Sequence, residues 1–414
     1  MELNSPLRTT SLCLLFGSAL PFNVVAAIGD DSHLSINLRN LYLDRNFTNS
    51  DAPVDRVGNW SQGFDLQFES GYTDTRLAVG LDVNGQYALR LDSTGNDGSL
   101  PYSLYHQRAA DDYGRAGATL KLKFAKTLVR IGDQKPNLPV ASNDPSRLLD
   151  TLYQGAVIES RDIDRLQLTA GRFWSIVTRE SANHERLYRY GTSDSQDSDG
   201  LDFAGATYAI TPNLSVSYFH GVLNDIYRQD YGGLKHALAF GDGYLLSTQL
   251  GYFNNREDGS ARGGPVDNRA YSGLVTLEKS GHLVGISYQR MLGETNFPTL
   301  NGYAPQLYLP NWSGIPFIRP EERSWSVRYG YNFAEVGLPG LRLFTRYIKG
   351  SDVDRGAGLE NDAENERDVI INYTVQSGLF QRLSFELKNF RVQRKYETDY
   401  NEYRLITSYT WKFW

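Results

Sequence analysis

Basic side chains recur on one side of several alternating stretches, and these are the residues whose type and spacing point to chemistry. Arg328, Lys388 and Arg404 each fall on the polar side of a stretch in which apolar and polar residues alternate, and Arg342 and Arg346 share the polar side of another. A guanidinium can bind a carboxylate through two parallel hydrogen bonds, and a lysine acts as a point charge. The pattern favours binding of small anions. The simpler alternative is a polar face that carries some arginine by chance.

A second candidate is a proline-rich segment at residues 136–149, which ends in Ser146, Arg147 and two leucines. Its three prolines lack a backbone donor and restrict the chain, so the segment is stiff. A guanidinium held on a stiff segment can grip a carboxylate. The alternative interpretation is an ordinary exposed arginine in a loop.

Catalytic chemistry finds little support in the sequence. A hydrolase needs a histidine base beside a serine or between acids, and the nearest approach is Ser181, His184 and Glu185 in an expected loop. No pair of histidines or acids has metal-ligand spacing on one strand face, and the turn at residues 263–265 has no lysine or helix after it, unlike a phosphate-binding loop. The sequence therefore predicts no enzyme, no cofactor and no catalytic metal.

The elements that must position the basic residues read as β-strands. Mean hydropathy is −0.45, which excludes a bundle of transmembrane helices but allows a membrane barrel, where only alternate residues face lipid. In residues 324–333, Trp325, Val327, Tyr329 and Tyr331 share one side, opposite polar residues. The same period of two recurs at residues 34–39, 64–69, 214–218, 283–289, 341–347, 371–376, 383–388 and 403–413.

The connections between these strands sort into two kinds. Short turns are expected at residues 84–85, 211–213, 280–282, 338–340 and 377–378, and long polar loops at about 92–112, 137–152, 175–200, 223–243, 253–270, 291–322 and 350–367. Short turns at one rim and long loops at the other are typical of an outer-membrane barrel of roughly 16–20 strands. A soluble β-sandwich or β-helix would alternate too, but would not sort its loops in this way.

The first 27 residues read as a secretory signal peptide. Arg8 supplies a positive start, residues 12–20 an apolar core, Pro21 its end, and Ala26-Ala27 a cleavage site. The expected organisation is a signal at residues 1–27 and one barrel at 28–414. The only cysteine, Cys13, would leave with the signal, so no disulfide or thiol chemistry is expected in the mature chain.

Short segments in this order resemble the OprD-type porin family, the substrate-specific channels of Gram-negative outer membranes. They lie at residues 38–42, 60–64, 69–72, 111–117, 225–229, 375–378 and 401–406. The resemblance implies an all-β, closed barrel of 18 antiparallel strands whose third loop folds into the lumen. It also implies passive diffusion of small carboxylate-bearing solutes across the outer membrane.

The resemblance extends to individual site residues. Ser146 and Arg147 match the family's constriction serine and arginine, while Arg45, Arg56, Lys388 and Arg404 stand where the family carries a ladder of basic residues. Two other ladder positions read Asn372 and Glu386, so the ladder is thinned. Arg328, Arg342 and Arg346 are the candidates to replace the missing positions.

Specificity is expected to come from aromatic side chains. The stretch matching the family's seventh loop, residues 309–320, has no acid to receive a cationic group and offers Trp312 instead, and Tyr188 and Tyr190 lie near an aromatic position of the pore. The prediction is a channel for monocarboxylates with apolar or aromatic bodies. The alternatives are a channel for basic amino acids and small peptides, a non-selective porin, a barrel sealed for adhesion, or a barrel hydrolase.

The expected partners are small carboxylate solutes and outer-membrane lipid, with the chain a monomer or weak homotrimer. A net charge of −6 argues against nucleic acid. Acids are expected in the outer loops, at residues 194–199 and 352–368, around a positive constriction. Lipid should face one set of aromatic residues, namely Trp325, Tyr329, Tyr331, Tyr403, Tyr409, Trp411 and Phe413.

Overall fold

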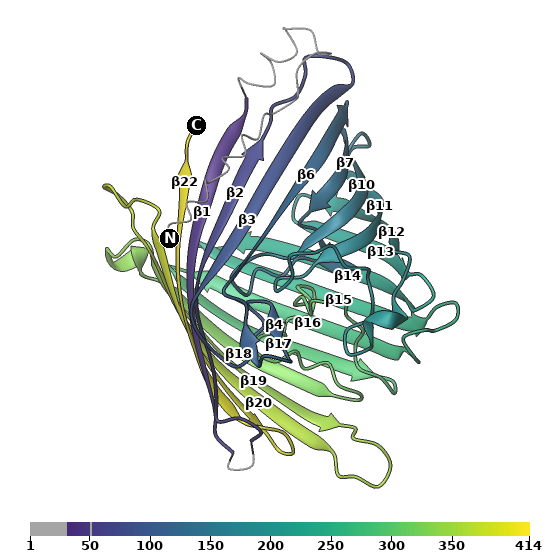
Figure 1. Cartoon of the computed structure of the whole chain (residues 1–414), viewed down its shortest axis with the longest axis vertical. Helices are drawn as coiled ribbons and strands as arrows, with labels where there is room; N and C mark the ends of the chain where they lie inside the picture. Colours follow the sequence, from purple (N-terminus) through teal and green to yellow (C-terminus); the bar gives the residue numbers. More distant parts are fainter. Residues whose placement is uncertain (1–30, 50–51) are drawn as a thin grey trace, which may run out of the picture.

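Antiparallel strands close into a barrel in this computed structural model, which describes residues 31–49 and 52–414 (Figure 1). The described residues form an 18-stranded sheet in which β22 pairs with β1, as the resemblance implies. The wall strands are β1 (His33–Phe47), β2 (Arg56–Glu69), β3 (Ala78–Thr94), β6 (Asp112–Phe124), β7 (Thr127–Gln134), β10 (Leu152–Ser160), β11 (Leu166–Val177), β12 (Leu201–Thr211), β13 (Leu214–Leu223), β14 (Tyr227–Phe240), β15 (Tyr244–Glu257), β16 (Asp267–Lys279), β17 (His282–Leu292), β18 (Arg323–Asn332), β19 (Leu341–Val353), β20 (Asp362–Thr374), β21 (Ser384–Arg394) and β22 (Tyr400–Lys412).

Minor elements lie in the connections. Two short hairpins are β4 (Tyr102–Ser103) with β5 (Arg108–Ala109), and β8 (Asn137–Leu138) with β9 (Ala141–Ser142); two 3-10 turns are η1 (Asp194–Gln196) and η2 (Phe333–Val336). Among the described residues, no helix has the length and apolar character needed to cross a membrane. The expected signal at residues 1–27 lies outside the described residues.

Inward and outward positions alternate along the strands as the sequence predicts. In β22, Glu402 and Arg404 are buried inside, whereas Tyr403 and Leu405 are exposed outside. Trp325, Trp411 and Phe413 are likewise exposed. The other expected lipid-facing rings, Tyr329, Tyr331 and Tyr409, are half-buried, because Tyr331 packs on Phe333 and Tyr409 on Trp411.

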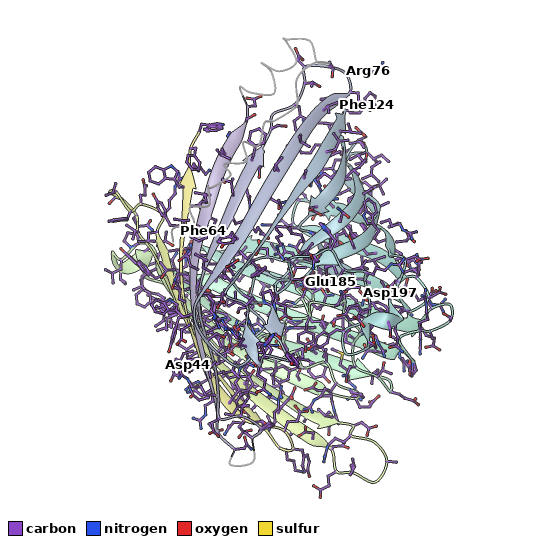
Figure 2. The ribbon with its side chains drawn as sticks, in the orientation of Figure 1. Asp44, Phe64, Arg76, Phe124, Glu185 and Asp197 are labelled. Atoms are coloured by element: carbon purple, nitrogen blue, oxygen red, sulfur yellow. The ribbon has the colours of Figure 1, made fainter. Side chains whose placement is uncertain are left out.

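The longest connections gather at one rim and mostly shorter ones at the other (Figure 2), although β13 and β14 are joined at the long-loop rim by residues 224–226 alone. Arg76 and Phe124 lie together at the short-turn rim, with the guanidinium 5.4 Å from the ring centre. The predicted turn at residues 84–85 is wrong: Gly85 lies inside β3, opposite Leu66 on β2 and Ala116 on β6. Pairing on both sides outweighs the local turn preference of Asn-Gly.

Several expected loops also contain strand, and two of them contain part of the barrel wall that was not expected there. Residues 223–243 include all of β14, whose outward positions near the rim are polar, such as Arg228, while Tyr227 and Tyr231 are buried inside. Here polar residues face outward and aromatic residues face inward, which is the reverse of the pattern expected for a strand that faces lipid. Residues 362–368, expected in an acidic outer loop, begin β20 and point acids into the lumen.

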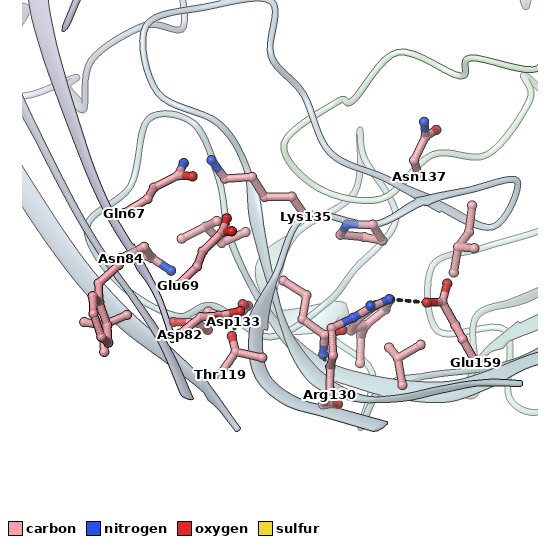
Figure 3. Close-up of a pocket in the computed structure, with 18 of the residues that line it drawn as sticks. Gln67, Glu69, Asp82, Asn84, Thr119, Arg130, Asp133, Lys135, Asn137 and Glu159 are labelled. Carbon is pink, nitrogen blue, oxygen red and sulfur yellow. Dashed lines mark hydrogen bonds and ion pairs between the residues drawn. The ribbon is translucent and has the colours of Figure 1, made fainter. Parts of the chain in front are cut away.

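The barrel is hollow on the side of the short turns. A cavity of about 460 Å³ is lined by Lys135, Asn137, Asp133, the Arg130–Glu159 ion pair and other mainly polar side chains (Figure 3). A second cavity of about 330 Å³ shares Lys135 and Gln67 with the first and also touches Arg39 and Pro145. The two cavities therefore adjoin between loop residues 135–151 and the short-turn rim.

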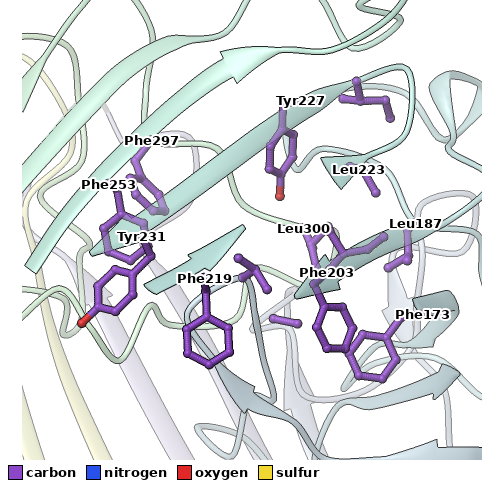
Figure 4. Close-up of a cluster of buried hydrophobic side chains, with 14 of the residues drawn as sticks. Phe173, Leu187, Phe203, Phe219, Leu223, Tyr227, Tyr231, Phe253, Phe297 and Leu300 are labelled. Atoms are coloured by element: carbon purple, nitrogen blue, oxygen red, sulfur yellow. The ribbon is translucent and has the colours of Figure 1, made fainter. Parts of the chain in front are cut away.

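The apolar core lies inside the barrel, toward the long loops. Phe173, Phe203, Phe219 and Tyr231 project inward from the wall and pack against Leu300 and other residues of loop 293–322 (Figure 4). A smaller cluster joins Leu148 and Leu149 of loop 135–151 to wall residues including Leu41 and Ile406. Burial of apolar area thus fixes both loops to the wall.

Candidate functional site

Loop 135–151 contacts inward-facing side chains of strands that are not its neighbours in the wall. The Pro145 carbonyl accepts a hydrogen bond from Arg39 Nη2 on β1 at 3.1 Å, and the Ser146 carbonyl accepts one from Arg404 Nη1 on β22 at 3.4 Å. Gly63 on β2 gives the loop room to pack closely, because a Cβ there would lie 3.1 Å from Leu148 Cγ, a tight contact. The contacts place this loop within the barrel.

Arg147 completes a convergence of guanidinium groups on the carbonyls of Pro145 and Ser146. Its Nε donates to the Asp97 carbonyl at 3.1 Å, and its Nη1 lies 3.4 Å from both the carbonyl and the hydroxyl oxygen of Ser146. Burial, then the charges of Arg404 and Arg179, lower the pKa of Arg147 to about 9, so the group is still protonated at neutral pH. Arg39, Arg147 and Arg404 are called the loop-3 cation cluster below.

Neutralisation of the cluster is incomplete. Arg404 pairs with Glu402 at 2.5 Å, and Arg45 pairs with the other oxygen of the same carboxylate at 2.5 Å. Among the described residues, neither Arg39 nor Arg147 has a carboxylate within 4.0 Å. Two guanidinium groups therefore lack an ion-pair partner within the described chain: Arg39 borders the 330 Å³ cavity, and Arg147 is buried beside Ser146. A region of positive potential results.

Lys388 lies directly beside the cluster. It is opposite Arg404 in the register of β21 and β22, and it pairs with Glu386 at 2.7 Å. Of the ladder positions expected from the resemblance, the structure thus brings Arg45, Lys388 and Arg404 to the same part of the wall as Ser146 and Arg147.

Arg328 and Arg346 form a second group under loop 293–322. Each donates to the Pro310 carbonyl at 3.1 Å, and Arg346 also pairs with Asp368 at 2.8 Å. As in the loop-3 cation cluster, guanidinium groups of the wall hold backbone carbonyls of a loop, but here both bind the same carbonyl. The charge of this second group is partly neutralised by Asp368.

The inward acids of β20 hold the same loop. Glu366 accepts hydrogen bonds from the backbone N–H of Gly314 at 2.7 Å and of Ile315 at 2.9 Å, one on each carboxylate oxygen, and Asp368 accepts one from the Ser313 hydroxyl at 2.8 Å. A typical intramolecular hydrogen bond contributes about 0.5–1.5 kcal/mol. We infer that Glu366 is the principal polar anchor of residues 313–315.

Substituting Glu366→Gln should loosen this loop. An amide NH2 would face one of the two backbone N–H groups, so one hydrogen bond is lost and a donor meets a donor. We expect cleavage of loop 293–322 by an added protease to become several times faster in the folded barrel. Glu386→Gln, which alters an inward acid that does not touch this loop, is the matched control. Equal cleavage of all three proteins would show that Glu366 is not the anchor.

Aromatic rings from two loops stack near the rim. The Tyr190 and Tyr303 ring centres are 4.3 Å apart, and those of Tyr303 and Trp312 are 5.4 Å apart. The stack follows from pairing of the loops, since Arg189 and Leu300 form an isolated β-bridge. Tyr190 and Trp312 were predicted site residues and are joined through Tyr303, which was not predicted. Tyr188 makes no ring contact of this kind among the described residues.

Two predicted ladder residues lie elsewhere. Arg56 has the outward parity of Trp60 and pairs with Asp44 on the outer face, so its placement in the lumen ladder is wrong. Arg342 is exposed at the start of β19, far along the strand from Arg346 toward the short-turn rim, and the described residues offer it no ion-pair partner. It is not part of either cation group.

Sequence reasoning missed Arg39, Arg179 and Tyr303. Arg39 was detectable, because it stands on the polar side of an alternating stretch. Arg179, which pairs with Asp144 and donates to the Ser146 hydroxyl at 3.3 Å, lies in a loop where no period applies. The partners of Tyr303 depend on loop pairing across the molecule, for which the sequence has no local signal.

The closed antiparallel wall, the apolar outer face and the charged lumen define an outer-membrane β-barrel channel. The family model for the outer membrane porin, OprD family, matches residues 27–413, and the chain belongs to this family. The protein is accordingly a porin of the outer membrane, and its family consists of channels.

Relatives and solved structures agree over nearly the whole chain. Porin-like protein GalP of Pseudomonas putida is 32% identical over 398 residues, which is 95% of this chain and 95% of the relative. The crystal structure of Pseudomonas aeruginosa OpdL is 42% identical with a TM-score of 0.84, covering 93% of this chain and 99% of the other. That of Pseudomonas aeruginosa OpdK with vanillate is 36% identical with a TM-score of 0.87, covering 92% and 99%.

Proposed function

We propose that this porin takes up small monocarboxylates with aromatic or apolar bodies by passive diffusion. The observation that carries the proposal is the convergence of Arg39, Arg147 and Arg404 on two consecutive loop carbonyls, those of Pro145 and Ser146, with Arg39 and Arg147 lacking a carboxylate partner among the described residues. A guanidinium is the side chain best suited to bind a carboxylate. A diffusing carboxylate can supply the missing negative charge.

The aromatic stack supports the second half of the proposal. A ring or apolar body that enters from the long-loop rim can lie against Tyr190, Tyr303 and Trp312 while its carboxylate reaches the cations. Stacked or edge-to-face rings are favoured by about 0.5–1.5 kcal/mol beyond the burial of their area. The solved structure of OpdK was obtained with vanillate, an aromatic carboxylate, which accords with this class of solute.

The solute then passes through the channel by moving between several weak binding sites. The carboxylate meets Arg147 and Arg39 at loop 135–151, with Arg404, Lys388 and Arg45 beside them on the wall, and Arg328 and Arg346 form a further station under loop 293–322. Beyond Arg39 lies the 330 Å³ cavity, which leads to the cavity of Figure 3. Each site must bind weakly enough for the solute to leave, since conduction fails at a deep well.

A channel for basic amino acids would need a free acid for the cationic group. Residues 309–320 contain none, and the acids beneath them are engaged: Glu366 by two backbone N–H groups and Asp368 by Arg346 and Ser313. These contacts support the carboxylate proposal over that alternative.

Liposome swelling tests the proposal with solutes matched in shape. We expect the porin to pass benzoate several times faster than neutral benzamide, and both faster than arginine, because the cations attract only the carboxylate. Bilayer recordings in dilute salt, where charges are least screened, should show anion preference. Equal rates for benzoate and benzamide, or fastest uptake of arginine, would contradict the proposal.

A further inference from the structure

A row of cations runs around part of the outer face, close to the long-loop rim. The positions have the outward parity of exposed apolar residues on the same strands, and the row extends over consecutive strands from β14 to β21. Its members are Arg228, Arg256, Arg269, Arg290, Arg323, Lys349, Arg367 and Arg391. None of them faces the lumen, so the uptake path does not use them.

Strand register sets like charges against one another in this row. Arg228 is directly opposite Arg256, Arg290 opposite Arg323, and Arg367 opposite Arg391. Like charges directly opposite on adjacent strands destabilise a sheet. An external anion between them would remove this repulsion.

Five members of the row have no carboxylate within 4.0 Å among the described residues, namely Arg228, Arg269, Lys349, Arg367 and Arg391, whereas Arg256 pairs with Asp267. Arg290 and Arg323 pair with Glu321 at 3.1 Å and Asp352 at 2.7 Å. In contrast, Lys349, Arg367 and Arg391 are exposed, and no described carboxylate lies within 4.0 Å of them. These three, on the neighbouring strands β19, β20 and β21, are called the outer cation patch.

The outer cation patch lies at the level of the membrane interface. Lys349 is directly opposite Trp325, and Arg367 is opposite Tyr347. The Trp325 and Tyr347 rings are exposed and 5.9 Å apart. Exposed Trp and Tyr mark the boundary between the hydrocarbon and the headgroups. Lys349 is two residues beyond Tyr347 on β19, a distance of about 7 Å along a strand. The cations therefore stand where lipid headgroups begin.

The opposite part of the wall has a different character. Two outward ion pairs lie near the long-loop rim in that part of the wall. Asp44 on β1 pairs with Arg56 on β2, and Asp202 on β12 pairs with Arg172 on β11 at 3.1 Å. Each cation in these pairs has its own carboxylate. Among the described residues, the outward strand cations near this rim that lack a carboxylate lie on strands between β14 and β21.

We propose that the outer cation patch binds the phosphate groups of anionic glycolipid in the outer leaflet of the outer membrane. One guanidinium group can bind two phosphate oxygens through two parallel hydrogen bonds, and Lys349 adds a point charge. The acyl chains of the same lipid would lie against the apolar outer face below Trp325 and Tyr347. Contacts with both the acyl chains and the headgroup would favour binding of a membrane lipid over binding of a free anion.

Lipid retention by the intact barrel tests this site. The probe is bisphosphorylated lipid A, incorporated with phosphatidylcholine into nanodiscs, and the readout is lipid A bound per barrel in native mass spectrometry. We expect the triple variant K349Q/R367Q/R391Q to retain lipid A about tenfold less tightly than the parent. Added salt should weaken retention in the parent, because the contacts are exposed. Single-channel conductance, which depends on the lumen, verifies that the variant is folded.

The matched control removes the same charge at the other rim. Lys126, Arg161 and Arg165 are exposed at neighbouring short turns, and K126Q/R161Q/R165Q should retain lipid A as the parent does. Equal retention by parent and outer-patch variant would overturn the proposal, as would equal loss in both variants, which would indicate net charge alone. Equal retention of dephosphorylated and bisphosphorylated lipid A by the parent would also refute a lipid-phosphate site. The same holds if inorganic phosphate protects the detergent-solubilised barrel from thermal unfolding as well as lipid A does, because the patch would then bind a free anion.

Discussion

Arg147→Ala should lower uptake of small aromatic carboxylates about tenfold at low solute concentration, while the barrel folds and inserts normally. A change of about 1.4 kcal/mol in one binding step corresponds to a factor of ten, and charge-assisted contacts are of this size. The substitution removes a guanidinium that has no ion-pair partner among the described residues and that lies against the Ser146 peptide. Strand pairing is unaffected, since Arg147 belongs to a loop.

The measurement is liposome swelling with benzoate over a range of concentrations, together with conductance in a planar bilayer. The variant should also show a wider pore and less anion preference. Arg56→Ala is the matched control, because it deletes the same side chain from the outer face, where it pairs with Asp44. If Arg147→Ala transports benzoate like the parent through an open pore, the role given to the loop-3 cation cluster is wrong.

The barrel could be predicted because its main determinant is local. Alternation with a period of two is imposed on every strand that separates lipid from lumen, and it is visible in residues 324–333 and 403–413 without knowledge of any partner. Where the strand extends beyond the lipid, the rule no longer applies. β14 buries Tyr227 and Tyr231 inside against the loops and exposes Arg228 outside, so its pattern resembled a polar loop.

The site could be predicted only where side chains sit on strands or in the stiff third loop. Arg404 and Lys388 follow from parity, and Arg147 from resemblance together with the prolines beside it. The contacts among loops could not be predicted, because they join residues far apart in sequence. Tyr190 meets Tyr303 only because residues 189 and 300 pair, and Glu366 meets residues 314 and 315 only because loop 293–322 folds back on β20.

The presence of many acids could be read from the sequence, but their location in the barrel could not. The sequence predicts that the acids at residues 362–368 lie in an outer loop, in contrast to a positive constriction. They instead point inward from β20 and hold a loop through hydrogen bonds. An acidic run on the sequence does not distinguish a solvated loop from a buried anchor, because both satisfy carboxylates, one with water and the other with backbone N–H groups.

Tyr303→Ala should reduce the preference for aromatic over aliphatic carboxylates about fivefold, with a smaller effect on total anion preference. Tyr303 lies between Tyr190 and Trp312, so its removal breaks the stack at its centre. The loss of about 1 kcal/mol for a ring contact gives this factor. The cations of loop 135–151 and the wall are untouched, and aliphatic acids should pass at nearly the rate of the parent.

The informative measurement is the ratio of benzoate to butyrate uptake in the same liposomes, because a change in pore number cancels from a ratio. Tyr303→Phe keeps the ring and should keep the ratio, which separates stacking from any hydrogen bond of the hydroxyl. Tyr188→Ala deletes a tyrosine of the other loop that lies outside the stack and should also leave the ratio unchanged. An unchanged ratio in Tyr303→Ala would mean that the aromatic stack holds loops 178–200 and 293–322 together without contacting the solute. The preference for aromatic bodies would then have to arise elsewhere, while the carboxylate role of Arg147 would stand, since it is measured by a different variant.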